Sequence, residues 1–301
     1  METINMMQPE LPDRPIYHYT SQKGLLGIVT SKKIWATNIQ YLNDETELTY
    51  AIELTREEVQ KLINKLQGKD IELLEEIARR LDTATWAGYD SSTSIYVCSF
   101  STECDQLSQW RGYCPDGNGF SIGFDFSRQP LIDLIKEQGF TLCKCKYKVE
   151  EQLDLVKQLM TKALDTFHQT HLGLLQDQIV QALATINFNI EFLRLAPQIK
   201  HPKYSEENEW RLISGPILVD NPRVKFREGK SMIIPYFEFN LVKENDPLHL
   251  QEIWIGPTKY WQLSRASLQT LLVASQVKGP DIIAGKFRPE VKITEIPYRA
   301  P

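Results

Sequence analysis

The chain has 301 residues, of which 42% are hydrophobic and 24% charged, and its formal net charge is -5. This composition is typical of a soluble globular protein with one large or two small domains, and it disfavours a general nucleic-acid binder, which is more often basic. No apolar run approaches the roughly 18 residues that a membrane span needs. Residues 1–14 lack the apolar core of a secretory signal. We therefore expect a cytoplasmic protein without a membrane partner.

Five cysteines are present, and this odd number in a long chain does not indicate a disulfide framework. Cys143 and Cys145 alternate with lysines, so both thiols point to one face of a strand, where we expect two small buried residues. A zinc site would need two more ligands at suitable spacing, and no Cys-x-x-Cys pair exists. No metal site is predicted.

The first half of the chain alternates short strands with helices after a loose arm over residues 1–14. Ser21 is the expected N-cap of the first helix, and Asp44 with Glu47 resembles a capping box at the start of the second. The pattern predicts strands over 16–20, 34–37, 94–100 and 120–126. It predicts helices over 23–31, 44–66 and 71–86, then a short helix with Leu107 and Trp110 and a turn over 114–119.

The second half contains the main shift in composition. Residues 150–195 are almost free of Gly and Pro and carry apolar residues at helical spacing, which predicts a helical hairpin inserted at about 150–200. Around it we expect helical turns over 131–137, strands over 141–149, 209–214, 232–241, 252–255 and 291–296, and a helix over 264–277. The strands come in hairpin-like groups, so the fold class is α+β with a mainly antiparallel sheet in a single domain over 15–301.

The first candidate site stretch is Tyr17-His18-Tyr19-Thr20-Ser21. A histidine at the start of a strand, beside two hydroxyl groups, can bind a ribose hydroxyl or serve as an acid or base. Alternatively, His18 is a half-buried strand histidine whose hydrogen bonds are satisfied within the fold.

The second stretch combines hydroxyl groups with aromatic rings. Ser99 and Ser101 share a strand face, and Trp110 and Tyr113 share a helix face. An aromatic face beside a hydroxyl suits a planar ring such as nicotinamide, and Arg111 could bind a pyrophosphate. Alternatively, Trp110 belongs to the core and Arg111 pairs with a surface acid.

The third stretch carries three carboxylates, Glu206, Glu207 and Glu209, before Trp210 and Arg211. On a strand, Glu207 and Glu209 would point to one face, and two close carboxylates raise the pKa of at least one of them. Such a carboxylate could stabilise positive charge at an anomeric carbon. Alternatively, one of them simply pairs with Arg211.

Other motifs are weaker. The chain has no Gly-x-Ser-x-Gly elbow and no Walker or Gly-x-Gly-x-x-Gly loop. A basic run in the C-terminal half is compatible with a nucleic-acid partner; alternatively, it is a solvated loop. Its members are Lys200, Lys203, Arg223, Lys225, Arg227 and Lys230.

The ordered series of these motifs resembles a bacterial and phage family of uncharacterised domains, some of which are linked with abortive infection and phage defence. The resemblance runs from about Pro15 to Arg299. Its motifs are Tyr17 to Ser21, Leu42 to Asp44 with Glu47, Cys98 to Ser101, Gln109 to Tyr113, Gly119 to Phe124, Glu207 to Arg211, Ile253 to Pro257 and Ile296 to Arg299.

A more distant similarity connects the series with the His-Tyr-Glu pattern of ADP-ribosyltransferases. It implies a split ADP-ribosyltransferase-like sheet with helical insertions, and NAD as the substrate. In this resemblance His18 holds the nicotinamide ribose, Tyr113 or Trp110 stacks on nicotinamide, and Glu209 or Glu207 is the catalytic glutamate. The implied nucleotide site comprises His18, Tyr19, Thr20, Ser99, Trp110, Arg111 and Tyr113. The chain departs from the pattern at Tyr19, where that superfamily often has a glycine.

The resulting hypothesis is an NAD-consuming ADP-ribosyltransferase or NAD glycohydrolase, acting as a toxin or effector in antiviral defence on a protein or nucleic-acid acceptor. Two alternatives remain open. One is a non-catalytic nucleotide-sensing or interaction module with the same cleft, and the other is a nucleic-acid-directed enzyme. The choice among Glu206, Glu207 and Glu209 is also open.

Overall fold

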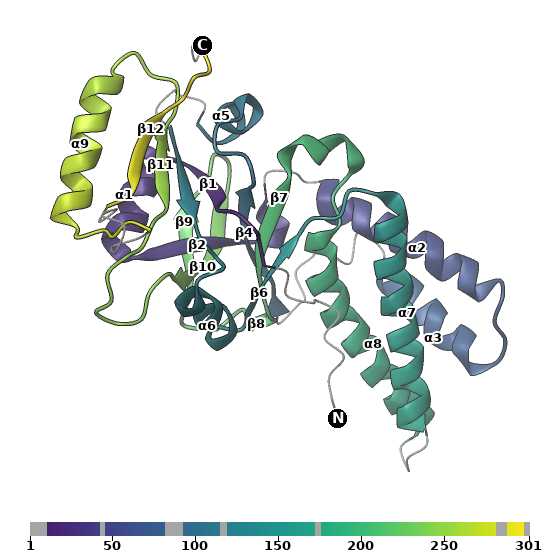
Figure 1. Cartoon of the computed structure of the whole chain (residues 1–301). Helices are drawn as coiled ribbons and strands as arrows, with labels where there is room; N and C mark the ends of the chain where they lie inside the picture. The colour runs from purple at the N-terminus through teal and green to yellow at the C-terminus, as the bar shows by residue number, and fades with distance from the viewer. Residues whose placement is uncertain are drawn as a thin grey trace.

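A computed structural model describes residues 11–42, 46–81, 93–114, 119–171, 176–280 and 288–297. These residues form a mixed α+β structure in which a mainly antiparallel sheet lies beside a layer of long helices (Figure 1). None of the helices in these ranges is long and apolar enough to cross a membrane. The expected motif residues Asn43, Asp44, Tyr298 and Arg299 lie outside the described ranges.

The sheet has a continuous path of strands with one branch. Along the path lie β12 (Glu290–Ile293), β11 (Glu252–Ile255), β5 (Gly119–Phe124), β1 (Ile16–Ser21), β4 (Tyr96–Ser101), β2 (Lys33–Asn38), β10 (Ile233–Asn240) and β9 (Val224–Glu228). In the branch, β7 (Glu209–Ser214) pairs with β4 and with β6 (Phe140–Lys144). Of the named pairs in the described sheet, only β11 with β12 is parallel, and α9 (Trp261–Ala274) connects these two strands. A separate small sheet pairs β3 (Thr93–Ser94) with β8 (Ile217–Leu218).

The sheet divides at β4. Tyr17 of β1 pairs with Ser101 at one end of this strand, whereas Thr37 of β2 pairs with Val97 near the other end. Along its opposite edge, β4 pairs with β7. β1 and β2 therefore leave the same edge of β4 and continue into two separate halves of the sheet.

The main core covers one face of this sheet. α1 (Gln22–Ser31), α6 (Gln129–Glu137) and α9 each bury apolar residues against it, and the strands contribute buried rings such as Phe100 and Phe124. Ser21 caps α1 as predicted, because its side chain accepts a hydrogen bond of 3.2 Å from the Gly24 amide. This bond satisfies one of the amides that lack a partner at a helix start.

A second core lies between α2 (Thr46–Ile63), α3 (Lys69–Arg80), α7 (Val149–His171) and α8 (Asp177–Leu195). The two helices predicted within 150–195 are confirmed as α7 and α8. The ends of this segment lie side by side, because Lys146 and Ile199 form an isolated bridge. A third apolar cluster joins Leu193 of α8 to Val97 and Ile213 of the sheet. The helical layer is therefore packed on the sheet at β4 and β7.

The predicted elements differ from the structure in several places. β9 and β8 are not among the predicted strands, and the parallel pairing of β11 with β12 departs from the hairpin-like grouping that the sequence indicated. The strand predicted over 141–149 corresponds to β6 (Phe140–Lys144); after it Lys146 forms an isolated bridge to Ile199, and α7 begins at Val149.

Candidate functional site

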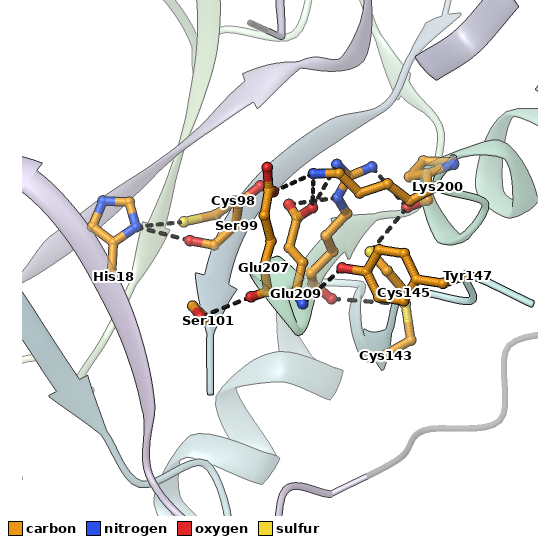
Figure 2. A network of polar contacts seen from close by, with 12 residues as sticks. His18, Cys98, Ser99, Ser101, Cys143, Cys145, Tyr147, Lys200, Glu207 and Glu209 are labelled. Carbon is orange, nitrogen blue, oxygen red and sulfur yellow. Dashed lines mark hydrogen bonds and ion pairs between the residues drawn. The ribbon is translucent and has the colours of Figure 1, made fainter. Parts of the chain in front are cut away.

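A polar cluster lies on the sheet face opposite the main core, at the start of β7. Glu209 pairs with Ser101 of β4, and Arg211 pairs with Ser99. Since directly paired residues of neighbouring strands point to the same face, these four side chains share one side of the sheet. Trp210 points the other way and belongs to the main core. Figure 2 shows Glu209 beside Glu207 and Lys200, next to β4.

The cluster is a network of ion pairs around Glu209, which is buried. Its Oε2 lies 2.5 Å from Lys200 Nζ. Arg211 donates from Nε to Oε1 at 2.8 Å and from Nη2 to Oε2 at 3.0 Å. Lys200 Nζ also donates to Glu207 Oε2 at 2.6 Å, so one ammonium group joins both carboxylates. The pairing of Glu209 with Arg211 is the alternative that the sequence left open.

The charges of this cluster balance: two carboxylates face one ammonium and one guanidinium group. Burial alone would raise the pKa of Glu209, but Arg211 and Lys200 outweigh this effect and hold the pKa at about 2. Glu209 is therefore an anion at neutral pH, and it remains so in a place that excludes water.

Segments beside the α7–α8 hairpin supply the rest of the cluster. Lys200 lies between two short 3-10 helices, η2 (Ala196–Gln198) and η3 (Pro202–Glu207). Pro197 accepts from Arg211 Nη1 at 2.9 Å, and the Tyr147 hydroxyl accepts from the Glu209 amide at 2.9 Å. Sequence reasoning missed Lys200 and Tyr147 as members of a site. The signal that was available for Lys200 is its position in an otherwise uncharged segment between two prolines.

Tyr113 ends α5 (Leu107–Tyr113) and is 38% exposed. The pKa of its hydroxyl is raised by partial removal from water and then by the negative charge of Glu209. Trp110 has a different environment although it shares the helix. It is fully buried, donates from Nε1 to Asp105 at 2.7 Å, and contacts Tyr19 edge-on at 4.8 Å between ring centroids. Trp110 is therefore a core residue, whereas the ring of Tyr113 is partly exposed to solvent.

His18 lies on the other face of the sheet. It pairs with Ile122, a fully buried member of the main core, and so points away from the face of Glu209. Its Nδ1 is 3.0 Å from the Ser99 carbonyl oxygen and 3.8 Å from Cys98 Sγ (Figure 2). Because a carbonyl oxygen can only accept, Nδ1 carries the proton in this bond. Removal from water lowers the pKa of His18, and the Ser99 bond partly offsets this.

Two neighbours of His18 are also engaged in the fold. Thr20 pairs with Phe120 and shares the face of His18. The Tyr19 hydroxyl donates to the Glu103 carbonyl at 2.7 Å and accepts from the Gln106 amide at 3.0 Å. Of the residues singled out in the sequence, the structure brings together Glu207, Glu209, Ser99 and Tyr113. It turns His18 and Thr20 to the opposite face of the sheet and buries Trp110 against Tyr19, and Arg111 lies exposed on α5.

The cysteines are all free, and Cys143 and Cys145 are buried as predicted. Among the described residues, no group of three or more His, Cys, Asp or Glu side chains is arranged to hold a metal ion.

Residues 109–212 match the model of a family described as "Protein of unknown function (DUF2971)". The DUF2971 match begins in α5 and ends in β7, so it contains Tyr113, Lys200, Glu207, Glu209 and Arg211. It agrees with the expectation of an uncharacterised domain, and it names no reaction. No curated protein matches the chain.

Proposed function

We propose that this chain cleaves the bond between nicotinamide and ribose in an NAD-type dinucleotide, and passes the ADP-ribosyl group to an acceptor or to water. The observation that carries this proposal is the pair of carboxylates, Glu207 and Glu209, joined through Lys200 at the start of a central strand. Glycosidic cleavage passes through an oxocarbenium-like state, which a nearby anion stabilises.

The two carboxylates differ in access, which assigns them different roles in this proposal. The Glu207 side chain is 21% exposed, whereas that of Glu209 is 5% exposed. Glu207 is therefore the carboxylate that a ribose reaches. Glu209 is the buried partner that holds Lys200 and Arg211 in place. Because the Lys200 ammonium group binds both glutamates, Glu209 also positions Glu207.

Two further residues support a substrate position above Glu207. Ser101 Oγ donates to the Glu207 carbonyl at 2.8 Å and accepts from the Glu103 amide at 3.1 Å, which holds the backbone at Glu207 against β4. The exposed ring of Tyr113, within the electrostatic reach of Glu209 and Glu207, offers a face for nicotinamide. His18 has no contact with ribose in this proposal. Instead it supports β4 through the Ser99 carbonyl.

The arrangement of strands is compatible with the resemblance to ADP-ribosyltransferases. The stretches that carry the resemblance include His18, Ser99 and Glu209, which lie on β1, β4 and β7. In the sheet β4 pairs with both β1 and β7. The chain departs from that pattern in its strand register, which turns the His18 side chain to the sheet face opposite that of Glu209.

The first test is release of nicotinamide from NAD by the purified chain, with candidate protein and nucleic-acid acceptors present. We expect Glu207→Gln to lower the rate about 100-fold, because an electrostatic stabiliser of the transition state is lost. Glu206→Gln is the matched control, since Glu206 is an exposed neighbour, and its rate should stay near that of the wild type. An active Glu207→Gln variant would transfer the role to Glu209.

A second candidate function is a non-catalytic nucleotide-sensing module. The observation that favours it is that both oxygens of Glu209 are bound by Lys200 and Arg211, as in a structural ion pair. In this case NAD would bind to the chain and remain intact after prolonged incubation. Absence of nicotinamide release from the wild type, together with measurable NAD binding, would make this the leading account.

A further inference from the structure

The last three strands of the sheet path, β2, β10 and β9, carry a surface that the carboxylate cluster does not use. Trp35 pairs with Glu238, and Lys225 pairs with Tyr236, so these side chains lie on the face opposite the main core. Phe237, one residue along, points into that core. We call the set Lys33, Trp35, Lys225, Arg227 and Tyr236 the aromatic–basic face. Arg223 lies at its edge, where its guanidinium rests over the Phe237 ring at 4.4 Å from the ring centroid and donates to Gln138 Oε1 at 3.3 Å.

Two rings form its centre. Trp35 and Tyr236 lie 4.3 Å apart between ring centroids with an interplanar angle of 32°. Tyr236 is buried, whereas Trp35 is 43% exposed and forms the outer ring of the pair. A tryptophan that rests on a second ring has little freedom to move, and its outer face is available to another planar group.

Cations surround these rings. Lys33 and Lys225 donate to Glu238 Oε2 at 2.8 and 2.9 Å, and Arg227 donates to Thr37 Oγ1 at 3.3 Å. A pocket of about 210 Å³ adjoins them. It is lined by Lys33, Pro222, Arg223, Lys225, Glu238 and Asn240, so three cationic side chains face one carboxylate. This local excess of positive charge contrasts with the net charge of -5 of the whole chain.

We propose that the aromatic–basic face binds single-stranded nucleic acid. An unpaired base can stack on the exposed side of Trp35, while Lys225 and Arg227 contact the phosphates on either side. A duplex keeps its bases stacked inside and cannot offer one to Trp35. A peptide of acidic residues alone would satisfy the cations but has no ring to place on Trp35.

The members of the basic run in the sequence lie in different parts of the structure. Lys200 does not belong to a basic surface, because it is buried in the carboxylate cluster. The pairing of β9 with β10 and of β10 with β2 brings Lys225 beside Lys33 at Glu238, and Arg227 beside Thr37. Binding at this face is independent of NAD cleavage, so the two proposals can fail separately.

The test is fluorescence anisotropy of a labelled oligo-dT and oligo-U, with a duplex of the same length for comparison. We expect the single strands to bind more tightly than the duplex, and the affinity to fall as salt rises. Trp35→Ala should weaken binding about tenfold or more, whereas Trp35→Phe should retain most of it. Lys225→Gln should weaken binding and reduce its dependence on salt.

Matched controls come from the exposed surface of other elements. Trp261→Ala, at a tryptophan 38% exposed in α9, and Lys23→Gln, at an exposed lysine in α1, should leave binding unchanged. Unfolding curves of all variants show whether a loss of binding is a loss of fold. The proposal is overturned if no strand binds at low salt, if Trp35→Ala and Trp261→Ala behave alike, or if poly-glutamate or the duplex binds as tightly as oligo-dT.

Discussion

At the scale of single residues, Glu209 shows how a charged side chain is tolerated inside a fold. Removing a carboxylate from water costs several kcal/mol, and only close opposite charges with good hydrogen-bond geometry offset that cost. Lys200 and Arg211 meet this need at both oxygens. The same contacts make the three residues depend on one another, because loss of one partner leaves an uncompensated buried charge.

Glu209→Gln should therefore destabilise the chain by about 3–5 kcal/mol at neutral pH, measured by urea unfolding. The pKa of Glu209 in the folded chain is about 2, below the ordinary 4.5, so its contribution is fully present above pH 4.5 and is lost as the pH falls toward 2. The variant should lose that part of the pH dependence. Glu206→Gln is the control, and a Glu209→Gln variant as stable as the wild type would refute the buried pairing.

At the scale of secondary-structure elements, two glycines allow β5, β11 and α5 to approach closely. The Gly256 amide donates to the Gly119 carbonyl at 2.9 Å. A Cβ atom at Gly256 would lie 2.9 Å from Trp110 Cζ3, and one at Gly119 would lie 1.8 Å from Cys114 Sγ. These glycines thus define how near the helix that carries Tyr113 can come to the sheet.

Gly256→Ala and Gly119→Ala should each lower the free energy of unfolding by about 1–3 kcal/mol, because the added methyl group meets atoms that are already packed. Gly112→Ala is the matched control within α5, where an added Cβ meets nothing within 4 Å. This substitution should stabilise the chain by about 0.5–1 kcal/mol. Thermal unfolding of the three variants provides the comparison, and equal effects at all three positions would contradict the close packing.

Many elements could be predicted because their residues carry a local pattern. The bounds of β7 and β11 are those predicted from the sequence, and Ser21 is the predicted N-cap of α1. Strand partners could not be predicted, since apolar alternation gives a period of two and says nothing of which strand lies alongside. The separation of His18 from Glu209 follows from the register of β1, β4 and β7, and the burial of Lys200 follows from partners distant along the chain.

At the scale of the whole molecule, the α7–α8 hairpin joins the second core to the sheet. Leu193 of α8 packs on the sheet, while the other side of the same helix packs on α3 and α7. The adjacent ends of the segment, Lys146 and Ile199, are compatible with an insertion, yet the buried side chains of α3 depend on it.

Replacing residues 149–195 by a short flexible linker should give an aggregating chain with little soluble yield. The reason is that Leu73, Leu74 and Ile77 of α3, which are fully buried, would face water. The same deletion with these three residues changed to Gln should recover soluble protein, as judged by size-exclusion chromatography. A soluble and cooperatively folding deletion without those changes would show that α2 and α3 form their own stable unit.

The long separation between paired strands has a consequence for synthesis on the ribosome. β2 is made early, but its partner β10 follows some 200 residues later, as the pairing of Thr37 with Tyr236 shows. At about 5–20 residues per second, that interval is roughly 10–40 s. During it the edge of β2 and the ring of Trp35 are without their final neighbours. The nascent chain therefore passes through a period in which a chaperone bound at this edge would protect it, and a translation pause before β10 would prolong the exposure.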